Sequence, residues 1–361
     1  MHPPKINFTP GPSQLYFTVQ DHIRFAFKKG IPSLSHRSKS FEQIFDSVVT
    51  GLRQLLVVPD DFHVFFTGSA TEIWERSIQN LVISDSLHLV NGAFSKRYFE
   101  TSQQLGRNAM KVEVKDGHGF NDFTPADSRP ELIAVTHNET STGVALPLSF
   151  IHTLSDQYPQ AIVAVDAVSS LPFPAFDYSC VDSVFFSVQK GFGLPAGLGV
   201  WLVNGRCIDK ANAMLSQGLS IGSYHTLPSL LAHAQKSQTP ETPNVLNMYL
   251  LARVLEDMLH VGISKIRNDT TYKATILYQA LEQHPLFQPF VEDPAYRSPT
   301  VIVANTGTHT ESLTRHLVAM GMQPGDGYGQ ARKTQLRFAN FPTHAKEHFE
   351  QLVDAITAYN G

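Results

Sequence analysis

The sequence predicts an α/β protein whose mostly parallel central sheet is covered by helices, followed by a smaller α+β domain at the C-terminus. Short strands that are apolar on both faces alternate with helical segments, as in a parallel sheet buried between helices. Near residue 244 the pattern changes to long helices and a strand pair. Because 361 residues exceed the size at which one core keeps growing, we expect a large domain at 16–243. Residues 1–15 and 244–361 would then form an N-terminal arm and a small domain.

The first elements of the large domain are marked by helical spacing and by turn residues. Residues 41–58 follow a Pro- and Gly-rich arm and repeat apolar residues at helical spacing. A short apolar strand then ends at Thr67, the turn Gly68-Ser69-Ala70-Thr71 follows, and a helix is expected from Glu72 to Leu81. Further short strands are predicted at 87–91, 131–140, 161–170, 182–190 and 198–203.

The C-terminal part has a different pattern of predicted helices and strands. Residues 244–284 predict two long helices, and a strand pair is expected at 300–305 and 334–340 with a helix at 309–321 between them. Long helices followed by a few strands are typical of a small α+β unit.

Composition excludes several classes of partner. An apolar fraction of 42%, a charged fraction of 17% and a formal net charge of -4 give no basic surface for nucleic acid. No apolar run approaches the roughly 18 residues needed to span a membrane, and the N-terminus lacks a signal-peptide pattern. With only two cysteines, Cys180 and Cys207, a disulfide framework is not expected. We therefore expect a cytoplasmic protein with neither a nucleic-acid nor a membrane partner.

Polar residues gather where the predicted strands end, which is where open α/β sheets bind ligands. Lys190 follows an apolar strand, and a lysine in a dry site can have a lowered pKa and form a Schiff base with an aldehyde. Asp166 ends a neighbouring strand and is suited to hold a pyridinium nitrogen protonated. The turn at 68–71 opens a helix, whose N-terminus binds phosphate. An acid, a lysine and a phosphate cradle together predict a site for pyridoxal phosphate.

Each of these features also has a simpler interpretation. The turn at 68–71 is also typical of an ordinary helix N-cap supported by Glu72. Asp166 could cap the next turn through its side chain, and Lys190 could be a surface lysine with a buried stem. The conjunction favours the cofactor site, since Asp166 and Lys190 both end apolar strands and lie 24 residues apart.

Eight stretches of the chain carry a resemblance to a known family. They are INFTPGPSQL, SHRSKSF, FFTGSATEIWE, NETSTG, VDAVSSLP, SVQKGFGLPAG, QTPETPN and QLRFANFP. The chain resembles the class V aminotransferases of fold type I, and among them most closely the phosphoserine aminotransferases. The resemblance covers nearly the whole chain and implies a homodimer with shared active sites that uses pyridoxal 5'-phosphate and no metal ion. Glutamate and 3-phosphohydroxypyruvate would give 2-oxoglutarate and phosphoserine, a step of serine biosynthesis.

The resemblance also implies a role for individual residues. Lys190 would carry the cofactor and shuttle the proton, and Asp166 would pair with the pyridinium nitrogen. The other implied cofactor contacts are Phe94 stacked on the ring, Thr140 at the phenolic oxygen, Ala70, Thr71 and Gln189 at the phosphate, and Thr242 of the neighbouring subunit. For the substrate, Arg337 would clamp the α-carboxylate, and His36 and Arg37 would face the distal anionic group.

Simpler interpretations of these residues remain open. Phe94 could be core packing, His36 and Arg37 a solvated basic turn, and Arg337 a strand-edge ion pair.

Some positions depart from the family pattern. Ala70-Thr71 replaces the glycine and arginine usual in phosphoserine enzymes and is closer to the turn of alanine–glyoxylate enzymes. Glu241 and Gly191 each stand where asparagine is usual, and Pro10 replaces a small polar residue. Arg332 and Lys333 are candidates to supply the missing positive charge.

Three other functions are alternatives to phosphoserine transamination. The first is transamination of the alanine–glyoxylate or serine–pyruvate type. The second is a lyase or desulfurase, disfavoured because both cysteines lie beside apolar strands. The third is a scaffold without chemistry, disfavoured by the presence of Asp166 and Lys190.

Overall fold

The large sheet has seven strands and carries the cavity described below. The computed structural model describes residues 6–121, 123 and 129–361. Within it the strand order is β2 (Phe62–Thr67), β10 (Gly199–Asn204), β9 (Ser183–Ser187), β8 (Ile162–Asp166), β5 (Leu132–Thr136), β3 (Asp85–Val90) and β4 (Asn108–Glu113). The five strands from β9 to β4 are parallel, and β10 runs antiparallel to both of its neighbours. The predicted mostly parallel α/β architecture is confirmed.

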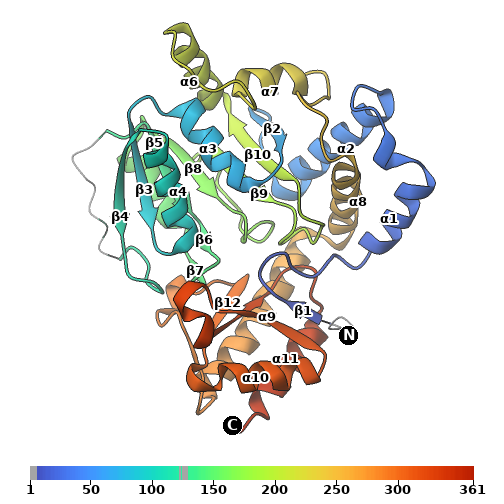
Figure 1. Ribbon diagram of the computed structural model, residues 1–361, viewed down its shortest axis with the longest axis vertical. Coiled ribbons are helices and arrows are strands. Elements are labelled where there is room, and N and C mark those ends of the chain that lie inside the picture. The colour runs from blue at the N-terminus through green and yellow to red at the C-terminus, as the bar shows by residue number, and fades with distance from the viewer. Residues whose placement is uncertain (1–5, 122, 124–128) are drawn as a thin grey trace.

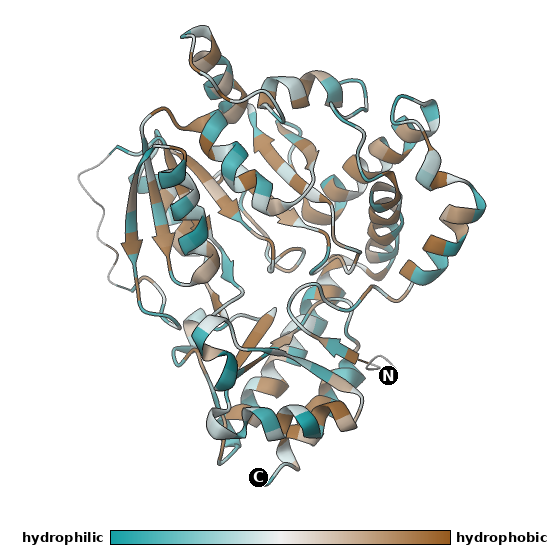
Figure 2. Cartoon of the chain, viewed as in Figure 1, coloured by the Kyte–Doolittle hydropathy of each residue, from teal (hydrophilic) through white to brown (hydrophobic). Residues whose placement is uncertain are grey.

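Helices cover both faces of this sheet (Figure 1). Alternate residues of β2, β5, β8, β9 and β10 enter two separate cores, as the two-residue period of a strand requires. One core is completed by α2 (Lys39–Leu56), α5 (Leu148–Gln157) and α8 (Val245–Val261). The other is completed by α3 (Ala70–Leu81), α4 (Ala93–Gln104), α6 (Gly205–Ser216) and α7 (Leu227–Ala234). Burial on both faces explains why the strands are continuously apolar (Figure 2).

The second sheet has five strands and lies below the first in Figure 1. Its order is β1 (Ile6–Phe8), β13 (Met322–Asp326), β14 (Gln335–Ala339), β12 (Val301–Asn305) and β11 (Gln288–Pro289). Only β1 and β13 pair in parallel, so the two ends of the chain share one sheet. Its core includes residues of α9 (Ile263–Gln283), α10 (Thr310–Ala319) and α11 (Lys346–Thr357).

Short elements complete the chain. They are α1 (Val19–Lys28), the strand pair β6 (Asn138–Glu139) and β7 (Val144–Ala145), and the 3₁₀ turns η1 (Ile31–Ser33), η2 (Pro294–Tyr296), η3 (Gly307–His309) and η4 (Gly329–Lys333). Among the described residues, no helix combines the length and apolar character needed to cross a membrane.

The helices predicted at 41–58 and across 244–284 correspond to α2, α8 and α9. The side chains of α8 join the core of the large sheet. The division of the chain into two domains with a boundary at 243 stays a prediction.

Three predicted strands were too long. The ladders of β5, β8 and β9 end at Thr136, Asp166 and Ser187. Beyond Asp166 the chain turns, because the Val168 amide donates to the Asp166 carboxylate. Lys190 therefore does not end a strand but lies in the loop that connects β9 to β10.

Asp182 precedes β9 and links it through hydrogen bonds to its neighbours β8 and β10. Its carboxylate accepts hydrogen bonds from the Val163 amide at 2.8 Å, the Asn204 side chain at 2.8 Å and Arg206 at 3.0 Å. Removing this side chain would leave buried donors of β8 and β10 without an acceptor, which is costly in the interior.

We therefore expect Asp182→Ala to lower the free energy of unfolding by about 2–4 kcal/mol. The free energy of unfolding of each protein is measured by denaturant unfolding followed by circular dichroism. The control is Asp209→Ala, which removes an exposed carboxylate of α6 and should leave the midpoint unchanged. Equal midpoints for both variants would contradict the assigned role of Asp182.

Candidate active site

A cavity of about 100 Å³ opens where β5, β8 and β9 end and α3 begins. Its position follows the rule that open α/β sheets bind ligands beyond the carboxyl ends of their strands. The lining residues are Ala70, Thr71, Trp74, Phe94, Thr136, Asn138, Thr140, Asp166, Val168, Ser187, Gln189 and Lys190. Of the eight predicted cofactor-binding residues, only Thr242 is absent from this set.

Asp166 lies at the base of the cavity and is buried. Its two oxygens accept hydrogen bonds from the Trp74 indole at 2.8 Å and the Val168 amide at 3.0 Å. Burial raises the pKa of Asp166 to about 6, although both hydrogen bonds and the nearby charge of Lys190 act in the opposite direction. The carboxylate is therefore a fixed acceptor in a dry environment.

Lys190 is buried in the same cavity. Its Nζ donates to Thr140 Oγ1 at 3.0 Å and lies 5.3 Å from the centre of the Phe94 ring. Burial lowers the pKa of Lys190 to about 8, while the negative charges of Asp166 and Glu139 partly offset this effect. A larger fraction of the amine is thus neutral and nucleophilic near neutral pH than for an exposed lysine.

The N-terminus of α3 forms the wall beside Ala70 and Thr71. The Ser69 hydroxyl accepts a hydrogen bond from the Glu72 amide at 3.2 Å, while Glu72 accepts from the Gly68 amide at 3.0 Å. The turn is thus a helix cap and also a wall of the cavity, so the two interpretations of 68–71 are compatible. The partial positive charge of a helix N-terminus suits this wall to a phosphate.

Glu139 holds the N-terminus of α4, which carries Phe94. This fully buried carboxylate accepts hydrogen bonds from the amides of Phe94, Ser95 and Ser141 at 2.9–3.3 Å. The hydroxyls of Ser95 and Ser141 donate to it as well, at 2.9 and 2.6 Å. Phe94 is therefore held over Lys190 by a buried acid.

Arg337 approaches the cavity from β14 of the small sheet. Its guanidinium donates to the backbone oxygens of Asp326 at 2.7 Å and Thr140 at 3.1 Å, and lies 5.5 Å from the Tyr328 ring centre. Among the described residues it forms no salt bridge, so the predicted alternative of a strand-edge ion pair is wrong. A cation without a carboxylate partner beside the cavity is suited to bind an anionic ligand.

The family model for class-V aminotransferases matches residues 6–323. The chain belongs to the class V aminotransferases. It is 48% identical to a phosphoserine aminotransferase from Cytophaga hutchinsonii ATCC 33406, with 99% of both chains covered and a TM-score of 0.96. A phosphoserine aminotransferase from Rhodococcus opacus (strain B4) is 29% identical over 327 residues, which are 89% of this chain and 86% of the relative.

A pyridoxal-phosphate-bound phosphoserine aminotransferase from Trichomonas vaginalis shares the fold at 17% identity, with a TM-score of 0.81 and 97% and 99% of the two chains covered. The resemblance found in the sequence is therefore confirmed, and the chain is a transaminase that depends on pyridoxal phosphate.

The predicted substrate residues His36 and Arg37 lie elsewhere in this aminotransferase. Arg37 donates to Gln238 and to the backbone oxygens of Thr239 and Pro240 at 2.8–3.2 Å. Thr242 is exposed, and its hydroxyl lies 3.3 Å from His36 Nδ1. His36, Arg37 and Thr242 therefore form one group, and none of them lines the cavity of its own chain.

The departures from the family pattern have local explanations at two positions. A Cβ on Gly191 would lie 2.0 Å from the Leu171 backbone oxygen, so no side chain fits. Buried Pro10 packs on Gly325 of β13.

Arg332, a candidate for the missing positive charge, instead pairs with Asp326 on the surface at 2.9 Å. Neither it nor Lys333 lines the cavity.

The N-terminal arm lies against the loop that carries Lys190. The amides of Ser13 and Tyr16 donate to the backbone oxygens of Gln189 and Gly193 at 3.1 and 2.8 Å. A Cβ on Gly11 would lie only 3.0 Å from Lys190 Cε. The arm thus packs directly on the lysine stem.

His225 connects the start of α3, just after the turn at 68–71, to the segment that bears Thr242. This residue was not identified by the sequence analysis. Its buried ring bonds Glu72 at 2.6 Å through Nδ1 and Glu241 at 2.7 Å through Nε2. Burial acts to lower the pKa of His225, but the two carboxylates outweigh it and raise the pKa to about 9. The backbone φ of 51° at His225 is strained for a residue other than glycine, which indicates that its surroundings hold it in place.

We expect His225→Gln to destabilise the enzyme by on the order of 2 kcal/mol at pH 6 and by much less at pH 10. Because the folded-state pKa is raised from 6.5 to about 9, the stabilisation is complete below pH 6.5 and is lost as pH rises through 9. Denaturation midpoints of both proteins between pH 6 and 10 measure this. His260→Gln, at an exposed position of α8, is the control. A pH-independent difference for His225→Gln would contradict a charged bridge.

Proposed function

We propose that this aminotransferase moves the amino group of glutamate to 3-phosphohydroxypyruvate, giving 2-oxoglutarate and phosphoserine for serine biosynthesis. The relative of 48% identity is a phosphoserine aminotransferase and aligns over 99% of both chains. The observation that carries the chemistry is the placement of Lys190 and Asp166 in one dry cavity, beside the helix N-terminus of α3. We also propose a cytoplasmic location, supported by two free cysteines.

The residues of the cavity fit pyridoxal phosphate. Three lining side chains, Thr136, Asn138 and Gln189, each have a buried oxygen without a partner among the described residues, which is expected where a polar ligand completes the site. Lys190 would hold the aldehyde carbon, Asp166 the ring nitrogen, Thr140 the phenolic oxygen and the start of α3 the phosphate. When bound, the cofactor supplies an electron sink for the substrate Cα–H bond.

The protein would bind and orient the substrate and move its proton. Nζ of Lys190, once free, is the base that takes the proton from the substrate Cα, and Thr140 orients it through the 3.0 Å hydrogen bond. Phe94 shields one side of the cavity, and Arg337 is available for a bidentate contact with the α-carboxylate. The buried Asp166, oriented by Trp74 and Val168, would hold the ring nitrogen of the cofactor in its protonated form.

A second substrate class is supported by the lining of the cavity. It contains Ala70 and Thr71 and no arginine or histidine. If Lys190 holds the cofactor and Arg337 the α-carboxylate, a phosphorylated substrate needs further cations, whereas small substrates of the alanine–glyoxylate or serine–pyruvate type do not.

We expect L-phosphoserine to convert the visible absorption of the lysine-bound cofactor to that of its amino form, and L-alanine at equal concentration to do so much more slowly. Stopped-flow absorbance measures both reactions. The control is Lys190→Ala, which lacks the lysine that would be linked to the cofactor. Conversion by alanine but not by phosphoserine would favour the second substrate class. No conversion by any amino donor would contradict transamination.

We further propose a homodimer in which His36, Arg37 and Thr242 of one copy complete the cavity of the other. Two observations support this. The group presents the Arg37 guanidinium, the His36 imidazole and the Thr242 hydroxyl together, and it is placed outside the cavity of its own chain. Apart from Lys190, the lining of the cavity has no cationic side chain that could bind a phosphate.

Mixing two inactive variants tests the shared site. We expect Lys190→Ala and Arg37→Ala to be inactive or weak alone, and to recover about a quarter of wild-type activity after unfolding and refolding together. Random pairing makes half of the dimers mixed, and each mixed dimer has one site with both residues. Lys39→Ala, at an exposed position of the same turn, should be fully active. No recovery in the mixture would place Arg37 and Lys190 in the same chain's site.

A further inference from the structure

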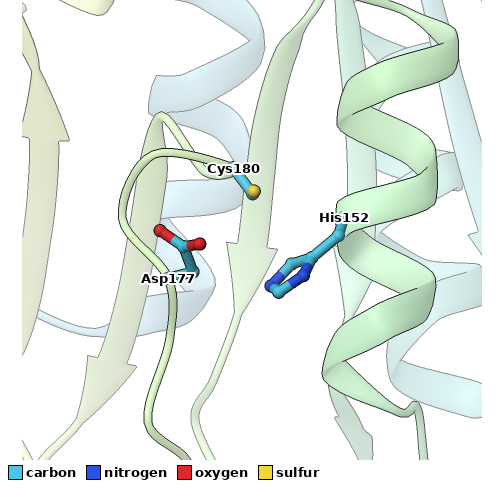
Figure 3. Close-up of side chains that lie close together, drawn as sticks. All are labelled: His152, Asp177 and Cys180. Atoms are coloured by element: carbon cyan, nitrogen blue, oxygen red, sulfur yellow. The ribbon is translucent and has the colours of Figure 1, made fainter.

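A second cluster of chemically reactive side chains lies outside the Lys190 cavity. One nitrogen of His152, one carboxylate oxygen of Asp177 and Sγ of Cys180 all lie within 4.8 Å of one another. Figure 3 shows the imidazole extending from its helix toward a loop that presents the thiol and the carboxylate. None of the three lines the active-site cavity.

The local structure holds these side chains in place. His152 belongs to α5, and its neighbour Ile151 is buried in the core of the large sheet. Asp177 and Cys180 begin and end a tight turn in which the Cys180 amide donates to the Asp177 backbone oxygen at 3.1 Å. Tyr178, between them, is buried in the same core. Core residues therefore hold both α5, which carries His152, and the turn that carries Asp177 and Cys180.

The carboxylate is oriented by the same turn. The amide and the hydroxyl of Ser179 both donate to Asp177 Oδ1, at 3.0 and 2.7 Å. These contacts leave Oδ2 free to bind a cation, and an outer hydrogen bond of this kind is what orients a metal-binding carboxylate.

We propose that His152, Asp177 and Cys180 bind a Zn²⁺ ion, with water as the fourth ligand. Imidazole, carboxylate and thiolate are the three ligand types that zinc takes in proteins, whereas magnesium and calcium prefer oxygen alone. Three atoms mutually within 4.8 Å all lie within about 2.8 Å of a common point. Because Zn–S and Zn–N bonds are about 2.3 and 2.0–2.1 Å long, shifts of less than about 1 Å would complete the site.

The site is accessible and independent of transamination. Asp177 is exposed, and the other two residues are half-buried, so a hydrated ion can enter. Binding requires the Cys180 thiolate, and the thiol proton leaves to solvent. The ion would fasten α5 to the 167–182 segment, which connects Asp166 to β9.

The test is zinc binding to the tag-free holoenzyme after chelation and dialysis. Competition with a chromophoric chelator should give one equivalent per chain with a dissociation constant on the order of 1 µM or lower. Cys180→Ser, His152→Gln and Asp177→Asn should each weaken binding by at least about tenfold, the lower end of what loss of even an outer-shell partner costs. Co²⁺ should give visible d–d bands, at wavelengths beyond the cofactor's absorption, that Cys180→Ser abolishes.

Controls separate this site from other binding. His260→Gln, an exposed histidine of α8, should bind zinc as the wild type does, and melting curves of the metal-free variants should match the wild type. Binding that survives all three ligand substitutions would assign zinc to the cofactor or to other histidines and overturn the proposal. Failure to bind zinc at micromolar concentrations would overturn it as well.

Discussion

The removal of water from Asp166 and Lys190 is the constraint on which the active site depends. The two buried groups carry opposite charges, and burial moves their pKa values toward each other, to about 6 and about 8. Such a pair persists only if the interior supplies hydrogen bonds in place of water. Trp74 and Val168 do so for the acid and Thr140 for the amine. The large sheet, buried on both faces, creates the dry edge at which these partners meet.

Three carboxylates near the cavity illustrate how partners set the role of one functional group. Asp166 accepts two hydrogen bonds and retains free acceptor capacity toward the cavity. Glu139 receives five donors and is fully occupied in holding the start of α4. Glu72 is divided between the Gly68 amide and the cationic His225. Of the three, only Asp166 lines the cavity, and the other two hold the elements that carry lining residues.

The sequence carried enough information for the large sheet and for the chemistry at its edge. Alternation of apolar strands with helices is a local signal, and the rule for carboxyl ends brought Asp166, Lys190 and the turn at 68–71 to one cavity. Trp74, Glu139 and His225 could not be found in this way, because their partners are 92, 45 and 153 residues away along the chain. The ends of β5, β8 and β9 were misplaced, because whether a residue beyond the last apolar position pairs in the sheet or turns is set by hydrogen bonds that the apolar pattern does not show. No local pattern could place His36 beside Thr242, because 206 residues separate them along the chain.

The parallel pair of β1 with β13 gives the chain a particular order of assembly. The arm that packs on Lys190 begins at β1, yet the strand that fixes β1 starts at Met322. At roughly 5–20 residues per second, a ribosome needs on the order of 15 s to 1 min to make the intervening chain. β1 can therefore pair with β13 only after most of the intervening chain has been made. All seven strands of the large sheet and the loop that carries Lys190 precede Met322, so they are made before the strand with which β1 pairs.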